Sequence, residues 1–181
     1  MPALINIEIY ESLNKIMIDG VDIKLNNFLN HSEVKSIETN SEFPNYRFKQ
    51  LAGLTFSYYK RNLQLEEKWH AIEFCTSYAN VFQQKNKLIQ FNEGVKDGFI
   101  KILKEMNEHF SSPMILVTNE ICNGFFFEYN FGNGSKDFAE FELGLIRKNK
   151  ISLIDTSKYT ILEEKDEFNI YIQENEYVTW K

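Results

Sequence analysis

Apolar and polar residues alternate along much of the chain after residue 112, which is the pattern of strands that bury one face of a sheet. Short polar turns separate these runs. Strands joined by such short connections pair antiparallel, because a parallel crossover needs about a dozen residues or more. The predicted strands in this half are residues 114–118, 124–131, 138–146, 151–154, 159–162, 168–172 and 177–180.

The first half of the chain adds strands and a turn signal. Residues 4–10 alternate as a strand does, and residues 54–59 are a further strand candidate. The Asp19-Gly20 pair lies between β-prone runs and predicts a hairpin over residues 15–25, because Asp-Gly favours the tight turn of a two-residue hairpin loop. The chain is therefore expected to begin with antiparallel sheet.

Two longer segments place apolar residues at helical spacing. In residues 65–85 spacings of three and four favour a helix, although the aromatic and β-branched content would also suit a strand. Asn92 precedes a second apolar stripe and is expected to cap a helix that runs to Phe110. A short helix is predicted near residues 32–39. The two stripes are Trp69, Ile72, Cys75, Ala79 and Phe82, and Val95, Phe99, Ile102, Met106 and Phe110.

Together these elements predict an α+β fold, in which a predominantly antiparallel sheet packs against two main helices. No internal repeat, low-complexity stretch or linker rich in Pro, Ser or Gly divides the chain. A chain of 181 residues is long enough to bury a core without disulfides or metal ions. We therefore expect residues 1–181 to form a single α+β domain.

Composition and charge narrow the classes of function. Hydrophobic residues make up 43% and aromatic residues 15% of the chain, and no apolar run reaches the roughly 18 to 20 residues of a membrane helix. Glu8 and Glu11 interrupt the first apolar segment, which lacks the basic start of a secretory signal, so we expect a cytoplasmic location. The net charge is −6, and such a chain repels nucleic-acid phosphates. Neither direct nucleic-acid binding nor membrane association is expected.

Residues that often catalyse reactions or bind metals are scattered. His70 and Glu73 could share a face of the predicted helix, but zinc needs three or four ligands. The other histidines, His31 and His109, lie in separate segments. The two cysteines form no CxxC pair, and Cys75 is expected in the core. We predict no catalytic residue, no metal site and no cofactor.

Residues 124–146 combine carboxylates with aromatic rings around a Gly-Asn-Gly turn. If both arms are strands, side chains alternate between an apolar face and a mixed face. The mixed face consists of Phe126, Glu128, Asn130, Phe138, Glu140 and Glu142. It is either an ordinary solvated face or an interface, in which a ring fills a pocket of a basic partner and carboxylates steer the encounter.

The segments GFFFEYNF and DFAEFELGLI resemble an inhibitor surface. The whole chain, small, acidic and without catalytic motifs, resembles the immunity proteins that bacteria pair with secreted or contact-delivered toxins. The resemblance implies a basic protein partner, such as a nuclease toxin, whose active groove is covered by the mixed face.

Two other classes of function stay open. A curved sheet closed by the helix over residues 92–110 would form an aromatic pocket, as in an enzyme or a small-ligand-binding domain. Exposed sheet edges would instead serve a structural or assembly protein.

Overall fold

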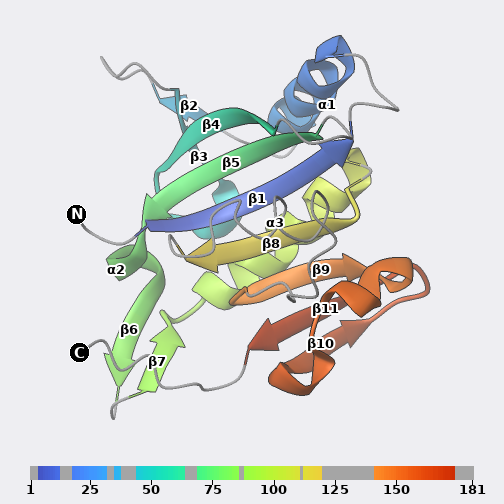
Figure 1. Ribbon diagram of the computed structural model, residues 1–181. Coiled ribbons are helices and arrows are strands. Elements are labelled where there is room, and N and C mark those ends of the chain that lie inside the picture. The colour runs from blue at the N-terminus through green and yellow to red at the C-terminus, as the bar shows by residue number, and fades with distance from the viewer. Residues whose placement is uncertain are drawn as a thin grey trace.

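The computed structural model describes residues 4–12, 18–31, 35–37, 44–63, 69–85, 88–110, 112–119 and 141–173. In this part of the chain one nine-stranded sheet runs in the order β10-β11-β9-β8-β1-β5-β4-β3-β2, and its neighbouring strands are antiparallel (Figure 1). The strands are β1 (Leu4–Ser12), β2 (Lys35–Ile37), β3 (Asn45–Arg47), β4 (Phe56–Leu63), β5 (Trp69–Ser77), β8 (Met114–Asn119), β9 (Leu143–Arg147), β10 (Tyr159–Glu164) and β11 (Phe168–Gln173). The predicted α+β fold, with a predominantly antiparallel sheet, is confirmed.

Two long helices accompany this sheet, α1 (Ile18–His31) and α3 (Val95–His109) (Figure 1). A separate two-stranded sheet pairs β6 with β7. The remaining described elements are α2 (Tyr78–Val81), β6 (Phe82–Lys85), β7 (Leu88–Phe91) and the 3-10 helices η1 (Lys49–Leu51), η3 (Lys148–Leu153) and η4 (Thr156–Lys158). None of the described helices has the length and apolar character needed to cross a membrane.

The core lies between one face of the sheet and the two long helices. β1 turns Ile5, Ile7 and Ile9 toward it, and each is 0% exposed. Phe28 of α1 and Phe99 of α3 pack into the same cluster. Burying one large apolar side chain stabilises the fold by about 1.5–3 kcal/mol. In the part of the chain that the structure describes, the fully buried phenylalanines are Phe28, Phe48, Phe56, Phe74, Phe99 and Phe110.

α3 agrees with its predicted apolar stripe, but its start differs from the prediction. The N-cap is Gly94, whose φ of 75° is left-handed and therefore suits glycine. Asn92 lies just before the helix, where its backbone carbonyl accepts a hydrogen bond from Val95 N and its side chain donates to Asn80 O. The amide of Asn92 thus fixes α3 to the α2 segment instead of capping the helix.

The hairpin predicted over residues 15–25 is wrong, because the chain from Ile18 onward forms α1. Leu25 and Phe28 are three residues apart and both buried, while Ile23 is 59% exposed, which is the pattern of an amphipathic helix. The Asp-Gly pair falls in the first helical turn, where the helix dipole favours an acidic residue. A local turn signal was therefore outweighed by packing on the core.

The helix predicted within residues 65–85 is also wrong, since this segment forms β5, α2 and β6. β5 lies between β1 and β4, and its residues 72–76 are all buried, so the helical spacing of its apolar residues did not decide its structure. Its aromatic and β-branched content was the better guide. Because residues 69–77 form a strand, the helix face on which His70 and Glu73 could have met is not formed.

Two predictions of short elements also differ from the structure. Within residues 32–39, Lys35–Ile37 is the strand β2 rather than a helix, because it pairs with β3. Residues 151–153, predicted as strand, belong to η3. The predicted strands 124–131 and 177–180 lie outside the described residues, as does the start of 138–146.

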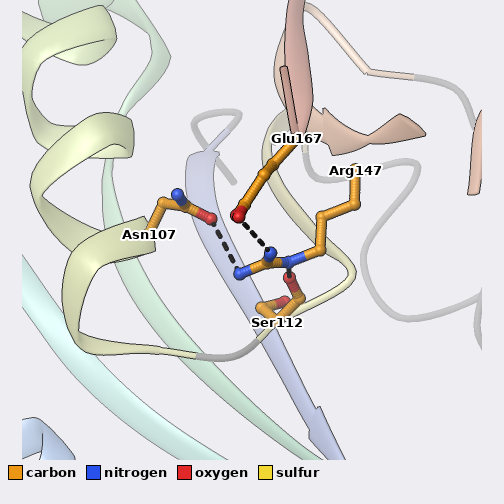
Figure 2. A network of polar contacts seen from close by, with 4 residues as sticks. All are labelled: Asn107, Ser112, Arg147 and Glu167. Atoms are coloured by element: carbon orange, nitrogen blue, oxygen red, sulfur yellow. Dashed lines mark hydrogen bonds and ion pairs between the residues drawn. The ribbon is translucent and has the colours of Figure 1, made fainter. Parts of the chain in front are cut away.

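Arg147 connects three parts of the structure that are distant in the sequence (Figure 2). Its Nε donates to Ser112 O at 3.0 Å, and Nη2 donates to Asn107 Oδ1 at 3.3 Å. Nη1 lies 3.4 Å from Glu167 Oε2. The end of α3, the approach to β8 and the β10–β11 turn are thereby held around the end of β9.

Candidate functional site

Of the six residues predicted to bind a partner, Glu142 alone falls within the described part of the chain. Phe126, Glu128, Asn130, Phe138 and Glu140 lie outside the described residues. Glu142 is half-buried and directly precedes β9. Its backbone N–H donates to Val117 O at 2.8 Å, and its carbonyl accepts from Gln173 N at 3.1 Å. The backbone of Glu142 is therefore fixed between two strands.

The described residues on either side of residues 120–140 are close together in the structure. The described chain leaves β8 at Asn119 and resumes at Phe141, just before β9. β8 and β9 are antiparallel neighbours, with Val117 opposite Leu143. Asn119 and Phe141 therefore lie at the same end of the sheet. Figure 1 shows α2 at the same end.

The negative charge of Glu142 affects the pKa of Tyr78 in α2. Burial raises the pKa of the Tyr78 phenol above its ordinary value of 10.0, and the negative charge of Glu142 raises this pKa further. A nearby carboxylate has this effect because it disfavours a second negative charge. Glu142, the described member of the predicted site, thus acts on an aromatic side chain at this end of the sheet.

A group of buried polar side chains lies on the sheet face that points away from the isoleucines of β1. Asn6 and Glu8 alternate with these isoleucines, and each is 1% exposed. Glu8 stands opposite Glu73 of β5, and Asn6 opposite Thr118 of β8. Glu73 is 3% and Thr118 1% exposed. We call Asn6, Glu8, Glu73 and Thr118 the polar cluster.

Hydrogen bonding within the polar cluster is uneven. Thr118 Oγ1 donates to Glu8 Oε1 at 2.6 Å. The side chain of Asn6 has no hydrogen-bond partner at either Oδ1 or Nδ2. Leaving a buried polar group unsatisfied costs about 1–3 kcal/mol. The polar cluster therefore contains one side chain, Asn6, that makes no hydrogen bond within the protein.

Sequence reasoning missed the polar cluster. In the segment Ile5–Ile9 the polar positions alternate with isoleucine, and such positions are ordinarily solvated. Their burial depends on strand order, since β1 pairs with β5 and β8, which are distant in the sequence. The sequence contains the two glutamates, but it has no local signal for the strand register that places them opposite each other.

Two histidines that are far apart in the sequence lie close together in the structure. His31 ends α1 and His109 ends α3, and their ring centroids are 5.7 Å apart. His31 Nδ1 lies 2.8 Å from Asn27 O, which fixes the ring orientation. No group of three or more His, Cys, Asp or Glu suitable for a metal occurs among the described residues.

The acidic segment 163–167 at the edge of the sheet is compensated by neighbouring cations. Lys104 Nζ lies 2.5 Å from Glu163 Oε1, and Lys148 Nζ lies 3.1 Å from Glu164 Oε1. Glu167 is bound by Arg147.

Aromatic rings fill the space between the sheet and α3 where a pocket was considered. Phe99 of α3 lies edge-on to Phe56 of β4 at a centroid distance of 6.3 Å, and Phe48 lies 5.1 Å from Phe56. All three side chains are at most 1% exposed. The rings contact one another, as in a packed core.

No protein-family model and no curated protein matches the chain.

Proposed function

We propose that the chain neutralises a basic protein partner, a toxin domain such as a nuclease, by covering its active groove. The surface responsible is the mixed face of Phe126, Glu128, Asn130, Phe138, Glu140 and Glu142. Such a protein acts in the cytoplasm of the bacterium that makes the toxin. It needs no catalytic residue, metal or cofactor for this function.

The observation that carries the proposal is the excess of carboxylates in the sequence between β8 and β9. In residues 120–140 four carboxylates accompany a single lysine. Carboxylates in excess of neighbouring cations are suited to attract a cationic partner, because complementary charge accelerates association and fixes orientation.

The topology supports the same surface. The segment 120–140 joins adjacent antiparallel strands, so both of its ends are held by the sheet at Asn119 and Phe141. An interface anchored at both ends loses less conformational freedom on binding than a free tail does. The compensated segment 163–167 is by contrast a weaker choice, since its charges already interact with Lys104, Arg147 and Lys148.

The test is charge reversal at two positions of the mixed face, Glu128→Lys combined with Glu140→Lys. The matched control is Glu164→Lys with Glu167→Lys, which changes the net charge equally. Both control side chains are well exposed, at 65% and 77%. Exposed ion pairs contribute about 0–1 kcal/mol, so both variants should unfold within a few degrees of the wild type.

The binding assay uses the partner recovered from the native host and then purified. Like charges opposed across an interface cost several kcal/mol, and each 1.4 kcal/mol weakens binding about tenfold. The mixed-face variant should lose at least about a hundredfold in affinity and fail to inhibit the partner, while the control stays within a few-fold of wild type. Equal losses in the two variants would show that only overall charge matters, and unchanged binding in both would place the interface elsewhere.

A further inference from the structure

The polar cluster brings together side-chain oxygen atoms from three adjacent strands, on one face of the sheet. Glu8 and Glu73 are directly opposed, and residues in such a pair have Cβ atoms about 4.5–5.5 Å apart. Asn6 precedes Glu8 by two positions and therefore shares its face. Thr118 bridges from β8 to Glu8 with a 2.6 Å hydrogen bond. Two carboxylates, one amide oxygen and one hydroxyl thus converge on a small region.

Asn6 is the observation that indicates a ligand. It is 1% exposed, and neither of its amide atoms has a hydrogen-bond partner. Its neighbours across the strands are Thr118 on one side and Cys75 on the other. An apolar residue would avoid the desolvation penalty at this position. A buried amide without a partner, next to two carboxylates, is explained if its carbonyl oxygen has a ligand in common with them.

We propose that the polar cluster binds a divalent cation of the oxygen-preferring class, such as Mg²⁺, Ca²⁺ or Mn²⁺. Carboxylates and amide carbonyls are the protein ligands that these hard cations prefer. Glu8 and Glu73 supply carboxylate oxygens for such a cation, and the Asn6 carbonyl supplies a neutral oxygen ligand. The site lies within the sheet, so its occupancy stabilises the fold. This inference does not depend on the identity of the protein partner.

The first measurement uses the wild-type chain and Mn²⁺ as a paramagnetic probe. Amide signals of Asn6, Glu8, Glu73 and Thr118 should broaden first in a ¹H–¹⁵N spectrum at substoichiometric Mn²⁺. Adding Mg²⁺ or Ca²⁺ to the metal-free chain should raise the Tm by a few degrees, because a ligand that binds only the folded state stabilises it. Broadening confined to exposed carboxylates such as Asp166, with an unchanged Tm, would overturn the proposal.

Variants separate cation binding from a purely structural role. Glu73→Gln preserves shape and removes one charge, and it should reduce the cation-dependent shift in Tm by more than half. Glu105→Gln is the matched control: Glu105 is a part-buried carboxylate that accepts from Gln50 Nε2 at 2.6 Å on the other side of the sheet. It should keep the full response. A Glu73→Gln protein that responds to cations like wild type would contradict the assignment.

Asn6→Leu provides a second and opposite readout. Without cations it should be at least as stable as wild type, because it removes an unsatisfied buried amide. With cations it should gain less stability than wild type does, since an oxygen ligand is lost. If Asn6→Leu leaves the cation response intact, the amide is not a ligand. If Glu73→Gln fails to fold, the Mn²⁺ spectrum of the wild type still decides between a site at the cluster and none.

Discussion

Substituting Gly98 by alanine tests the close approach of α3 to η1. A Cβ at Gly98 would lie 2.3 Å from Gln50 O and 2.6 Å from Leu51 Cδ2. The first of these is a backbone atom of η1, so a side-chain rotation cannot relieve the contact. η1 is further bound to α3 through Gln50 Nε2 and Glu105 Oε1. The substitution must therefore separate α3 from η1.

The expected magnitude follows from two opposing effects. Alanine favours the interior of a helix over glycine by about 1 kcal/mol. Overpacking a well-filled core costs about 1–3 kcal/mol, and the contact with a backbone oxygen places Gly98→Ala toward the upper end. The net loss should be about 1–2 kcal/mol, which for a chain of this size lowers the Tm by about 2–8 °C.

Thermal and urea unfolding followed by circular dichroism would measure this loss. Lys101→Ala is the matched control in the same helix, since Lys101 is exposed and both residues favour helix, and its Tm should change little. Gly94→Ala meets no atom within 4 Å but has a φ of +75°, so it should lose stability through backbone strain alone. A Tm that rises in Gly98→Ala would refute the close contact between α3 and η1.

Three other predictions concern the network, the hairpin base and the buried thiol. Arg147→Met, which keeps the apolar stem and loses the hydrogen bonds, should cost about 2–3 kcal/mol in urea unfolding, whereas Lys148→Met should cost no more than about 1. Glu142→Gln should lower the pKa of Tyr78 in NMR titrations of labelled tyrosine. Because folding raises this pKa, the stability that Tyr78 contributes is fully present below pH 10.0 and is lost as the pH rises through the higher pKa of the folded state. Glu142→Gln should make the stability depend less on pH in this range. Cys75→Ala should keep partner binding while losing about 1–3 kcal/mol, as measured by pull-down and unfolding.

Elements whose local pattern agrees with their tertiary packing could be predicted from the sequence. The strands that begin at Leu4, Met114, Tyr159 and Phe168 form where expected. α3 has an apolar stripe that no competing signal obscures, and Phe99, Ile102 and Met106 are buried as predicted. In these cases local pattern and tertiary packing favour the same structure.

The failures occur where tertiary context decides. β5 is covered on both faces, so Ile72, Glu73, Phe74 and Cys75 are all buried, and the helical spacing of its apolar residues was misleading. In α1 a local Asp-Gly signal competed with the packing of Phe28 on the core. The polar cluster could not be predicted because the register that places Glu8 opposite Glu73 joins segments far apart in the chain.

The candidate interface was predicted from alternation alone, and Glu142 is the one of its six residues that the structure describes. Glu142 is half-buried and affects Tyr78 because α2, the end of β8 and the start of β9 lie at the same end of the sheet. Sequence spacing does not reveal this arrangement.

The central claim, that an acidic surface attracts a basic protein partner, is tested most directly by the salt dependence of association. The rate constant for binding of the purified chain to its partner would be measured by stopped flow from about 0.01 M to about 1 M salt, over which the screening length falls from about 30 Å to about 3 Å. We predict a fall of at least about tenfold for wild type and a much smaller one for Glu128→Lys with Glu140→Lys. A wild-type rate constant that does not change with salt would contradict the account.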